Sequence, residues 1–181
     1  MFKDKNHFAL FGLTPSFRIA PDDLDPIYRK LNQQFHPDRM TRGNSREKLE
    51  ATLATAQINE AYETLKNPLK RGHYLLKCLD SDTDVPQEKT IKDADLLLEA
   101  LEQQEALSLA KTTQDIEPLL KQAQDKKSRT LLTIEKAFDE KDFSQARLNL
   151  YRYRYYEKLV NDATAQLNKI SEKLKDHAST A

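Results

Sequence analysis

The sequence predicts an all-α protein, and three features of its composition favour that class. Only 3 of the 181 residues are glycine, and the only valines are Val85 and Val160. Leucine, alanine, lysine, glutamate and glutamine, which favour helices, are abundant instead. Charged residues make up 32% of the chain, above the usual share of about 25%, so we expect much exposed helical surface. The scarcity of glycine also argues against a glycine-rich phosphate-binding loop.

Charge, cysteine content and hydropathy narrow the class further. The 29 basic and 29 acidic residues give zero formal net charge, which disfavours a strongly basic nucleic-acid-binding protein. The single cysteine, Cys78, excludes an internal disulfide, and its leucine neighbours predict a buried thiol. The apolar start at residues 8–13 is too short for a signal peptide, and no apolar run approaches the ~20 residues of a membrane span. We therefore expect a protein of the bacterial cytoplasm.

The first half of the chain carries patterns for four helices. A short apolar turn at residues 8–11 ends at Gly12. A second helix begins at Pro21 or Pro26, because proline fits comfortably only in a first turn, and ends near Phe35 because Pro37 disfavours helical backbone before it. Its apolar stripe consists of Leu24, Tyr28, Leu31 and Phe35.

The third helix begins after Asn44, which predicts an N-cap with Glu47 completing a capping box. Asn67 and Pro68 end it, and residues 69–79 predict a short fourth helix. The apolar positions of the third helix are Leu53, Ala54, Ile58, Ala61, Tyr62 and Leu65.

The second half of the chain has a different organisation. The polar, acidic stretch 80–87, broken by Pro86, predicts a linker between an N-terminal domain at 1–79 and a C-terminal domain at 88–181. Three long helical patterns follow, at 88–111, 115–139 and 142–176, with breaks at 112–114 and 139–142. Short connections between long helices predict a three-helix bundle.

The tripeptide of His36, Pro37 and Asp38 lies in the connection between the second and third helices. These residue types are also those that end a helix and form a turn, which is the simpler interpretation. Basic residues flank the tripeptide, however: Arg29 and Lys30 before it, Arg39 and Arg42 after it. A basic helix end with a fixed carboxylate can dock on an acidic partner.

The chain resembles the J-domain family in the segments IYRKLNQQFHPDRM and INEAYETLKNPLKRGHYLL. The segments FALFGLTPSF, NPLKRGHYLL and TIKDADLLLEALEQQEAL extend the resemblance to the HscB type of co-chaperone in iron–sulfur cluster assembly. The resemblance implies an L-shaped protein whose J-domain stimulates the ATPase of an Hsp70-class, HscA-like chaperone. The residues it implies for Hsp70 binding are His36, Pro37, Asp38, Tyr28, Arg29, Lys30 and Arg39.

The helix that opens the C-terminal domain has leucines on opposite sides. At about 100° per residue, Leu96, Ala100, Gln103, Leu107 and Ala110 form a core stripe, while Leu98, Leu101, Glu105 and Leu109 lie on the far side. Since Leu96, Leu97 and Leu98 cannot all face one core, at least one should be exposed or covered by something else. Geometry alone leaves open whether neighbouring helices cover these leucines. The resemblance implies that this face binds an IscU-like iron–sulfur scaffold protein through Leu97, Leu98, Leu101, Glu102, Glu105 and Tyr155.

The aromatic run at 151–156, YRYRYY, continues a helical pattern, with Tyr156 in the core stripe and Tyr155 at its edge. Arginine and stacking rings would also suit single-stranded RNA, so an RNA-associated helical protein is one alternative, and a J-domain co-chaperone for a different client is another. Enzymatic chemistry has little support, because the four histidines are scattered and Pro37 separates His36 from Asp38. We expect no catalytic residue, bound metal or cofactor. We also expect the protein not to bind a membrane, a nucleic acid or a small-molecule substrate.

Overall fold

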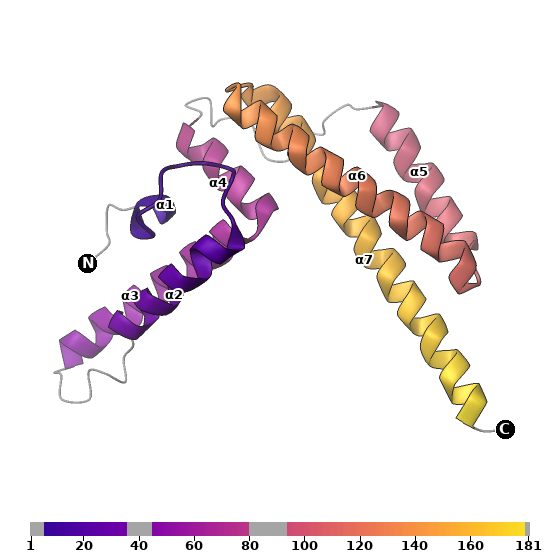
Figure 1. Ribbon diagram of the computed structural model, residues 1–181, viewed down its shortest axis with the longest axis horizontal. Coiled ribbons are helices and arrows are strands. Elements are labelled where there is room, and N and C mark those ends of the chain that lie inside the picture. Colours follow the sequence, from indigo (N-terminus) through magenta and orange to yellow (C-terminus); the bar gives the residue numbers. More distant parts are fainter. Residues whose placement is uncertain (1–5, 36–44, 80–93, 180–181) are drawn as a thin grey trace. The chain divides into compact units, whose positions relative to one another are not determined.

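The structure is a computed structural model, and it describes residues 6–35, 45–79 and 94–179. Every regular element in these ranges is a helix (Figure 1), which confirms the all-α prediction. The chain divides into two compact units, residues 1–83 and 84–181. The predicted linker at 80–87 and the N-cap Asn44 lie outside the described residues.

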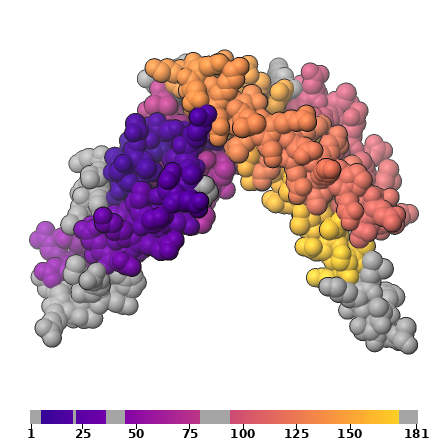
Figure 2. Space-filling view, viewed as in Figure 1, coloured from indigo at the N-terminus to yellow at the C-terminus, as the bar shows by residue number. Residues whose placement is uncertain are grey.

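The first unit contains helices α1 (His7–Leu10), α2 (Pro21–Phe35), α3 (Ser45–Lys66) and α4 (Pro68–Leu79). Helices α2 and α3 lie side by side and antiparallel (Figure 1), since Thr55 bonds to the end of α2 at Phe35 and Tyr62 bonds near its start at Asp25. Figure 2 shows the outer side of α2 as an exposed face of this unit.

Apolar side chains from all four helices form the core of the first unit. Phe8, Leu24, Ile58, Leu65 and Leu75 are almost completely buried. Two leucines of α3 lie outside this core: Leu53 and Leu49 are exposed by 57% and 59%. Both leucines lie in the first half of α3, where none of the described helices lies on the side of α3 away from α2 (Figure 1).

Helix α2 begins at the earlier of the two predicted positions, Pro21. Asp22 and Asp23 lie in its first turn, where carboxylates stabilise the positive end of the helix dipole. Pro26 is inside the helix and cannot donate to the Asp22 carbonyl, but both residues are exposed, so water can satisfy that group.

The second unit contains α5 (Ala94–Leu109), α6 (Thr113–Asp139) and α7 (Phe143–Ser179). Helices α6 and α7 form a long antiparallel hairpin, and α5 lies alongside it (Figure 1). The turn of the hairpin includes Lys141 with φ of 57°, which lies within the predicted second break at 139–142. One apolar cluster joins all three helices and contains Leu107, Ala110, Ile116, Ala123, Leu159 and Ala163.

Two sequence-based predictions need correction, one in the second unit and one in the first. The first break lies at residues 110–112 rather than 112–114, because Thr112 caps α6 and forms a capping box with Asp115. The thiol-bearing residue Cys78 is exposed rather than buried, because α4 turns Leu75 and Leu76 toward the core and Cys78 lies off that stripe. Among the described helices, none is long and apolar enough to span a membrane.

Candidate functional site

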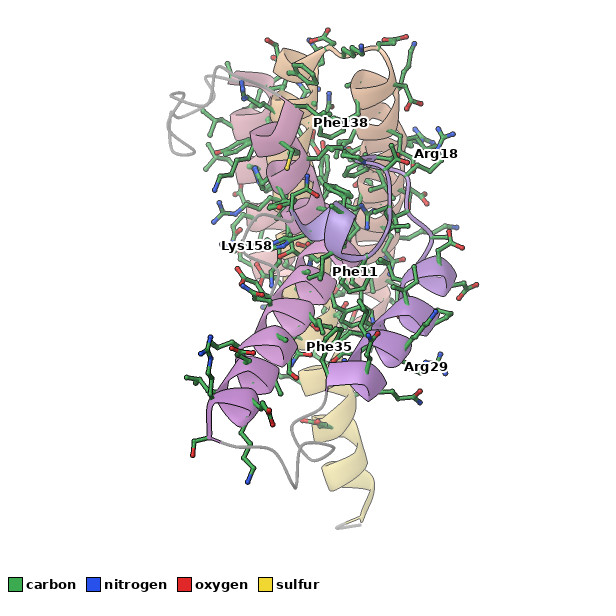
Figure 3. The ribbon with its side chains drawn as sticks, turned by 90° about the vertical axis from the view of Figure 1, so that its left-hand side faces the viewer. Phe11, Arg18, Arg29, Phe35, Phe138 and Lys158 are labelled. Carbon is green, nitrogen blue, oxygen red and sulfur yellow. The ribbon has the colours of Figure 1, made fainter. Side chains whose placement is uncertain are left out.

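The first candidate surface lies on α2 and contains Tyr28, Arg29 and Lys30. Arg29 and Lys30 are exposed, and Figure 3 shows Arg29 pointing away from α3, whereas Phe35 lies on the side toward α3. The remaining predicted Hsp70-binding residues, His36, Pro37, Asp38 and Arg39, lie outside the described residues. The described part of this surface is therefore a short basic face at the C-terminal half of α2.

Tyr28 is held against α3 rather than pointing freely into solvent. Its ring stacks on Tyr62, with ring centroids 3.9 Å apart and planes 16° apart, and its hydroxyl donates to Asn59 Oδ1 at 3.0 Å. The Tyr62 hydroxyl donates to Asp25 Oδ1 at 2.7 Å and accepts from Lys66 Nζ at 2.7 Å. That second hydrogen bond raises the pKa of Lys66. This tyrosine pair therefore locks the register of α2 on α3, directly beside the basic residues.

Arg71 is a structural residue of the same unit that sequence reasoning missed. It is only 7% exposed, and its Nη1 donates to the Leu65 carbonyl at 2.6 Å. Its guanidinium also lies 5.0 Å from the centre of the Phe17 ring. Because the last carbonyls of a helix lack partners within the helix, this hydrogen bond satisfies the end of α3. The motif NPLKRG shows the arginine but not what it binds.

The second candidate surface, here called the leucine surface, lies on α5 and consists of Leu97, Leu98 and Leu101 with Glu102 and Glu105. The three leucines are exposed by 49%, 59% and 70%, and both glutamates are exposed. The opposite side of α5 follows the predicted core stripe, with Leu96 and Leu107 buried and Ala110 buried just beyond the helix. The two-sided pattern of this helix is therefore confirmed, and its outer side is an apolar patch with an acidic edge.

Polar contacts attach α5 to the other two helices. Glu99 Oε1 accepts from Lys126 Nζ at 2.7 Å, and Glu99 Oε2 accepts from the Tyr156 hydroxyl at 3.0 Å. At the other end of the helix, Gln166 Nε2 donates to the carbonyls of Leu107 and Ala110 at 3.1 and 2.9 Å. These contacts come from both α6 and α7, so they set the rotation of α5 about its own axis.

The tyrosines of the aromatic run divide between core and surface. Tyr156 is buried, as predicted, and Tyr155 is half-buried, with its hydroxyl 3.5 Å from the Ala100 carbonyl of α5. Burial raises the pKa of Tyr155 to about 12, and the nearby Glu99 carboxylate adds to this effect. Tyr153 is also buried, which sequence reasoning missed; Lys127 lies over its ring at 5.3 Å.

Both candidate surfaces are suited to binding other proteins. Among the described residues, no group of three or more histidine, cysteine, aspartate or glutamate side chains could hold a metal ion. The α2 surface offers positive charge on a rigid helix pair, and the leucine surface offers exposed apolar area of the kind that marks partner sites.

Two family models match the chain, one in each unit. The model of the DnaJ domain matches residues 6–74, and the model of the HSCB C-terminal oligomerisation domain matches residues 92–164. A co-chaperone protein HscB homolog from Neisseria meningitidis is 32% identical over 164 residues, which cover 89% of this chain and 98% of the relative.

Solved structures agree with these matches over nearly the whole chain. The chaperone HscB from Vibrio cholerae has a TM-score of 0.80 at 26% identity and covers 92% of this chain and 99% of its own. Human co-chaperone protein HscB has a TM-score of 0.84 at 27% identity and covers 93% of this chain and 84% of its own. A J-domain unit and a three-helix unit that align together with HscB proteins show that this chain belongs to the HscB co-chaperone family.

Proposed function

We propose that this protein is a co-chaperone that stimulates the ATPase of an Hsp70-class chaperone and delivers the iron–sulfur cluster scaffold protein to it. The observation that carries the proposal is the union of both family matches in one chain that aligns with 98% of an HscB homolog. Its effect on chemistry then occurs in the partner's active site, so the chain itself is not an enzyme. We assign its partners as an HscA-like chaperone and an IscU-like scaffold, and its compartment as the bacterial cytoplasm.

The two units have separate roles in this proposal. Residues 1–79 are the J-domain, which docks through the tripeptide of His36, Pro37 and Asp38, through Arg39, and through the α2 surface. Support for the α2 surface comes from the exposure of Arg29 and Lys30 and from the tyrosine pair that fixes α2 on α3. Positive charge on a rigid helix accelerates encounter with an acidic partner and orients it.

Residues 88–181, joined to the J-domain by the linker at 80–87, carry the scaffold through the leucine surface and Tyr155. Support comes from the exposed fractions of the three leucines, since contiguous apolar side chains on a helix face usually mark a binding site. Tyr155 lies against the α5 backbone, where an aromatic ring can serve as an anchor at the edge of the interface.

The test is the steady-state ATPase rate of the HscA-like chaperone with and without this protein and the IscU-like scaffold. His36→Gln should abolish the stimulation and leave scaffold binding unchanged. The matched control is His73→Gln, the same chemical change at an exposed histidine on α4 of the same unit, which should preserve both activities. Unchanged stimulation of the ATPase by the His36 variant would refute the J-domain role. Failure of the unmodified protein to bind the scaffold would favour a J-domain co-chaperone for a different client.

A further inference from the structure

Helix α5 buries little apolar surface in the part that carries the leucine surface. Its apolar side chains are buried at Leu96 and again at Leu107, and between these positions no apolar side chain of α5 is fully buried. Leu97, Leu98 and Leu101 all lie in or beside this interval. The segment that presents the leucine surface therefore cannot depend on apolar packing alone for its position.

Glu99 is the side chain that joins this segment to both neighbouring helices. One carboxylate oxygen binds Lys126 of α6 at 2.7 Å, and the other accepts the Tyr156 hydroxyl of α7 at 3.0 Å. The side chains of Glu99 and Lys126 are only 25% and 33% exposed. Charge-assisted hydrogen bonds of this kind are stronger than neutral ones and are directional, so they fix the orientation of α5.

The Glu99 carboxylate also points away from the three leucines of the leucine surface. At about 100° per residue, Glu99 lies roughly 160° around the helix from Leu97 and from Leu101, and about 100° from Leu98. A partner centred on Leu97 and Leu101 approaches from the opposite side of α5. A role of Glu99 in scaffold binding must then act through the position of α5 rather than through contact.

We infer that Glu99 is a positioning residue for scaffold docking, which holds the leucine surface in its binding orientation through Lys126 and Tyr156. The inference rests on the proposed function, because it assigns the leucine surface to the scaffold. Without the carboxylate, the middle of α5 spends part of its time in other orientations, and apparent affinity falls in proportion to the binding-competent fraction. Loss of one partly buried ion pair and one hydrogen bond predicts a decrease of about five- to twentyfold.

The test compares Glu99→Gln with Glu157→Gln in binding of the purified IscU-like scaffold to the full chain. Glu157 pairs with Lys127 at 3.5 Å, and their side chains are 26% and 28% exposed, so this ion pair matches the Glu99 pair in burial. The Glu157 pair joins α7 to α6 instead of holding α5. We expect the Glu99 variant to bind about five- to twentyfold more weakly and the Glu157 variant to bind within about twofold of wild type.

Two further readouts separate positioning from direct contact. Amide hydrogen exchange in residues 94–109 should accelerate in the Glu99 variant while the melting temperature of the bundle stays near that of the Glu157 variant. The charge-exchanged double variant E99K/K126E should recover most of the affinity that E99K loses, because it restores the ion pair with reversed polarity. Equal weakening by the Glu99 and Glu157 variants overturns the inference. Weaker binding without faster exchange or rescue also overturns it, since Glu99 would then touch the scaffold.

Failure of the inference and failure of the proposed function are distinguishable in the same assay. A triple leucine variant that does not bind, beside a Glu99 variant that binds as wild type does, leaves the docking surface in place and overturns the positioning role. If the triple leucine variant binds with wild-type affinity, both the proposed docking surface and the positioning role of Glu99 are refuted.

Discussion

Replacing Leu97, Leu98 and Leu101 by alanine should weaken scaffold binding by orders of magnitude. With exposed fractions of 49%, 59% and 70%, the three side chains together leave nearly two leucines' worth of surface in water. Full burial of a leucine side chain contributes about 1.5–3 kcal/mol, so complete coverage by a partner contributes roughly 3–5 kcal/mol. Alanine keeps only the β-carbon, so about 2–4 kcal/mol is lost, which corresponds to a roughly 30- to 1000-fold increase in Kd.

The assay is titration calorimetry of the full chain with the IscU-like scaffold, with the single change Leu132→Ala as its control. Leu132 of α6 is 64% exposed, close to the 70% of Leu101, but it lies on a different helix. Since all of these leucines are exposed, the fold should tolerate their truncation, and the unfolding midpoint should stay near that of wild type. The prediction is refuted if the Kd of the triple variant is within about threefold of the Kd of the Leu132 variant, a difference in binding free energy of less than ~1 kcal/mol. Exposed apolar area would then have no part in docking.

Three further predictions concern stability and reactivity. Arg71→Met should lower the free energy of unfolding, measured by urea titration, by about 2–3 kcal/mol. The change removes a charge-assisted hydrogen bond and leaves the buried Leu65 carbonyl without its donor. An unchanged urea midpoint would show that this hydrogen bond contributes nothing to stability. Burial raises the pKa of Tyr155 from 10.0 to about 12, so the unfolded chain loses this proton first. The contribution of protonated Tyr155 to the free energy of unfolding is complete below pH 10.0 and is lost toward pH 12. Urea midpoints measured against pH, together with phenolate absorbance, should show this loss, and a urea midpoint that does not change over this pH range would contradict it. Cys78 should react with a thiol reagent without denaturant, because it is exposed, but slowly at neutral pH, because partial desolvation raises the pKa of its thiol. Protection of the thiol until the chain unfolds would contradict this prediction.

The outer face of α5 could be predicted from the sequence because helical periodicity is a local property. Rotation of about 100° per residue is enough to place Leu98 and Leu101 opposite Leu96 and Leu107, and the exposed fractions agree with this placement. The same arithmetic placed Tyr156 in the core. A property that depends only on which residues share a face of one helix can be predicted from the sequence alone.

Errors arose where burial depends on which other element covers a face. Cys78 lies beside apolar neighbours in the sequence, yet it is exposed, because α4 turns Leu75 and Leu76 toward the core instead. Tyr153 is buried because α6 packs against it. The start of α6, in contrast, had a local signal: Thr112 and Asp115 have the spacing of a capping box, with aspartate in place of the usual glutamate.

The polar residues of the α5 interface explain why its leucines remain outside. A rotation of α5 by about half a turn would bury Leu98 and Leu101, and each buried leucine contributes roughly 1.5–3 kcal/mol, so apolar burial alone does not favour the observed orientation strongly. The rotation would also carry Glu99 away from Lys126 and Tyr156, and it would leave a partly buried lysine and a tyrosine hydroxyl without this acceptor. The polar contacts therefore select between two apolar faces of one helix. Under the proposed function, the face that they exclude from the core is the one that remains available to the scaffold.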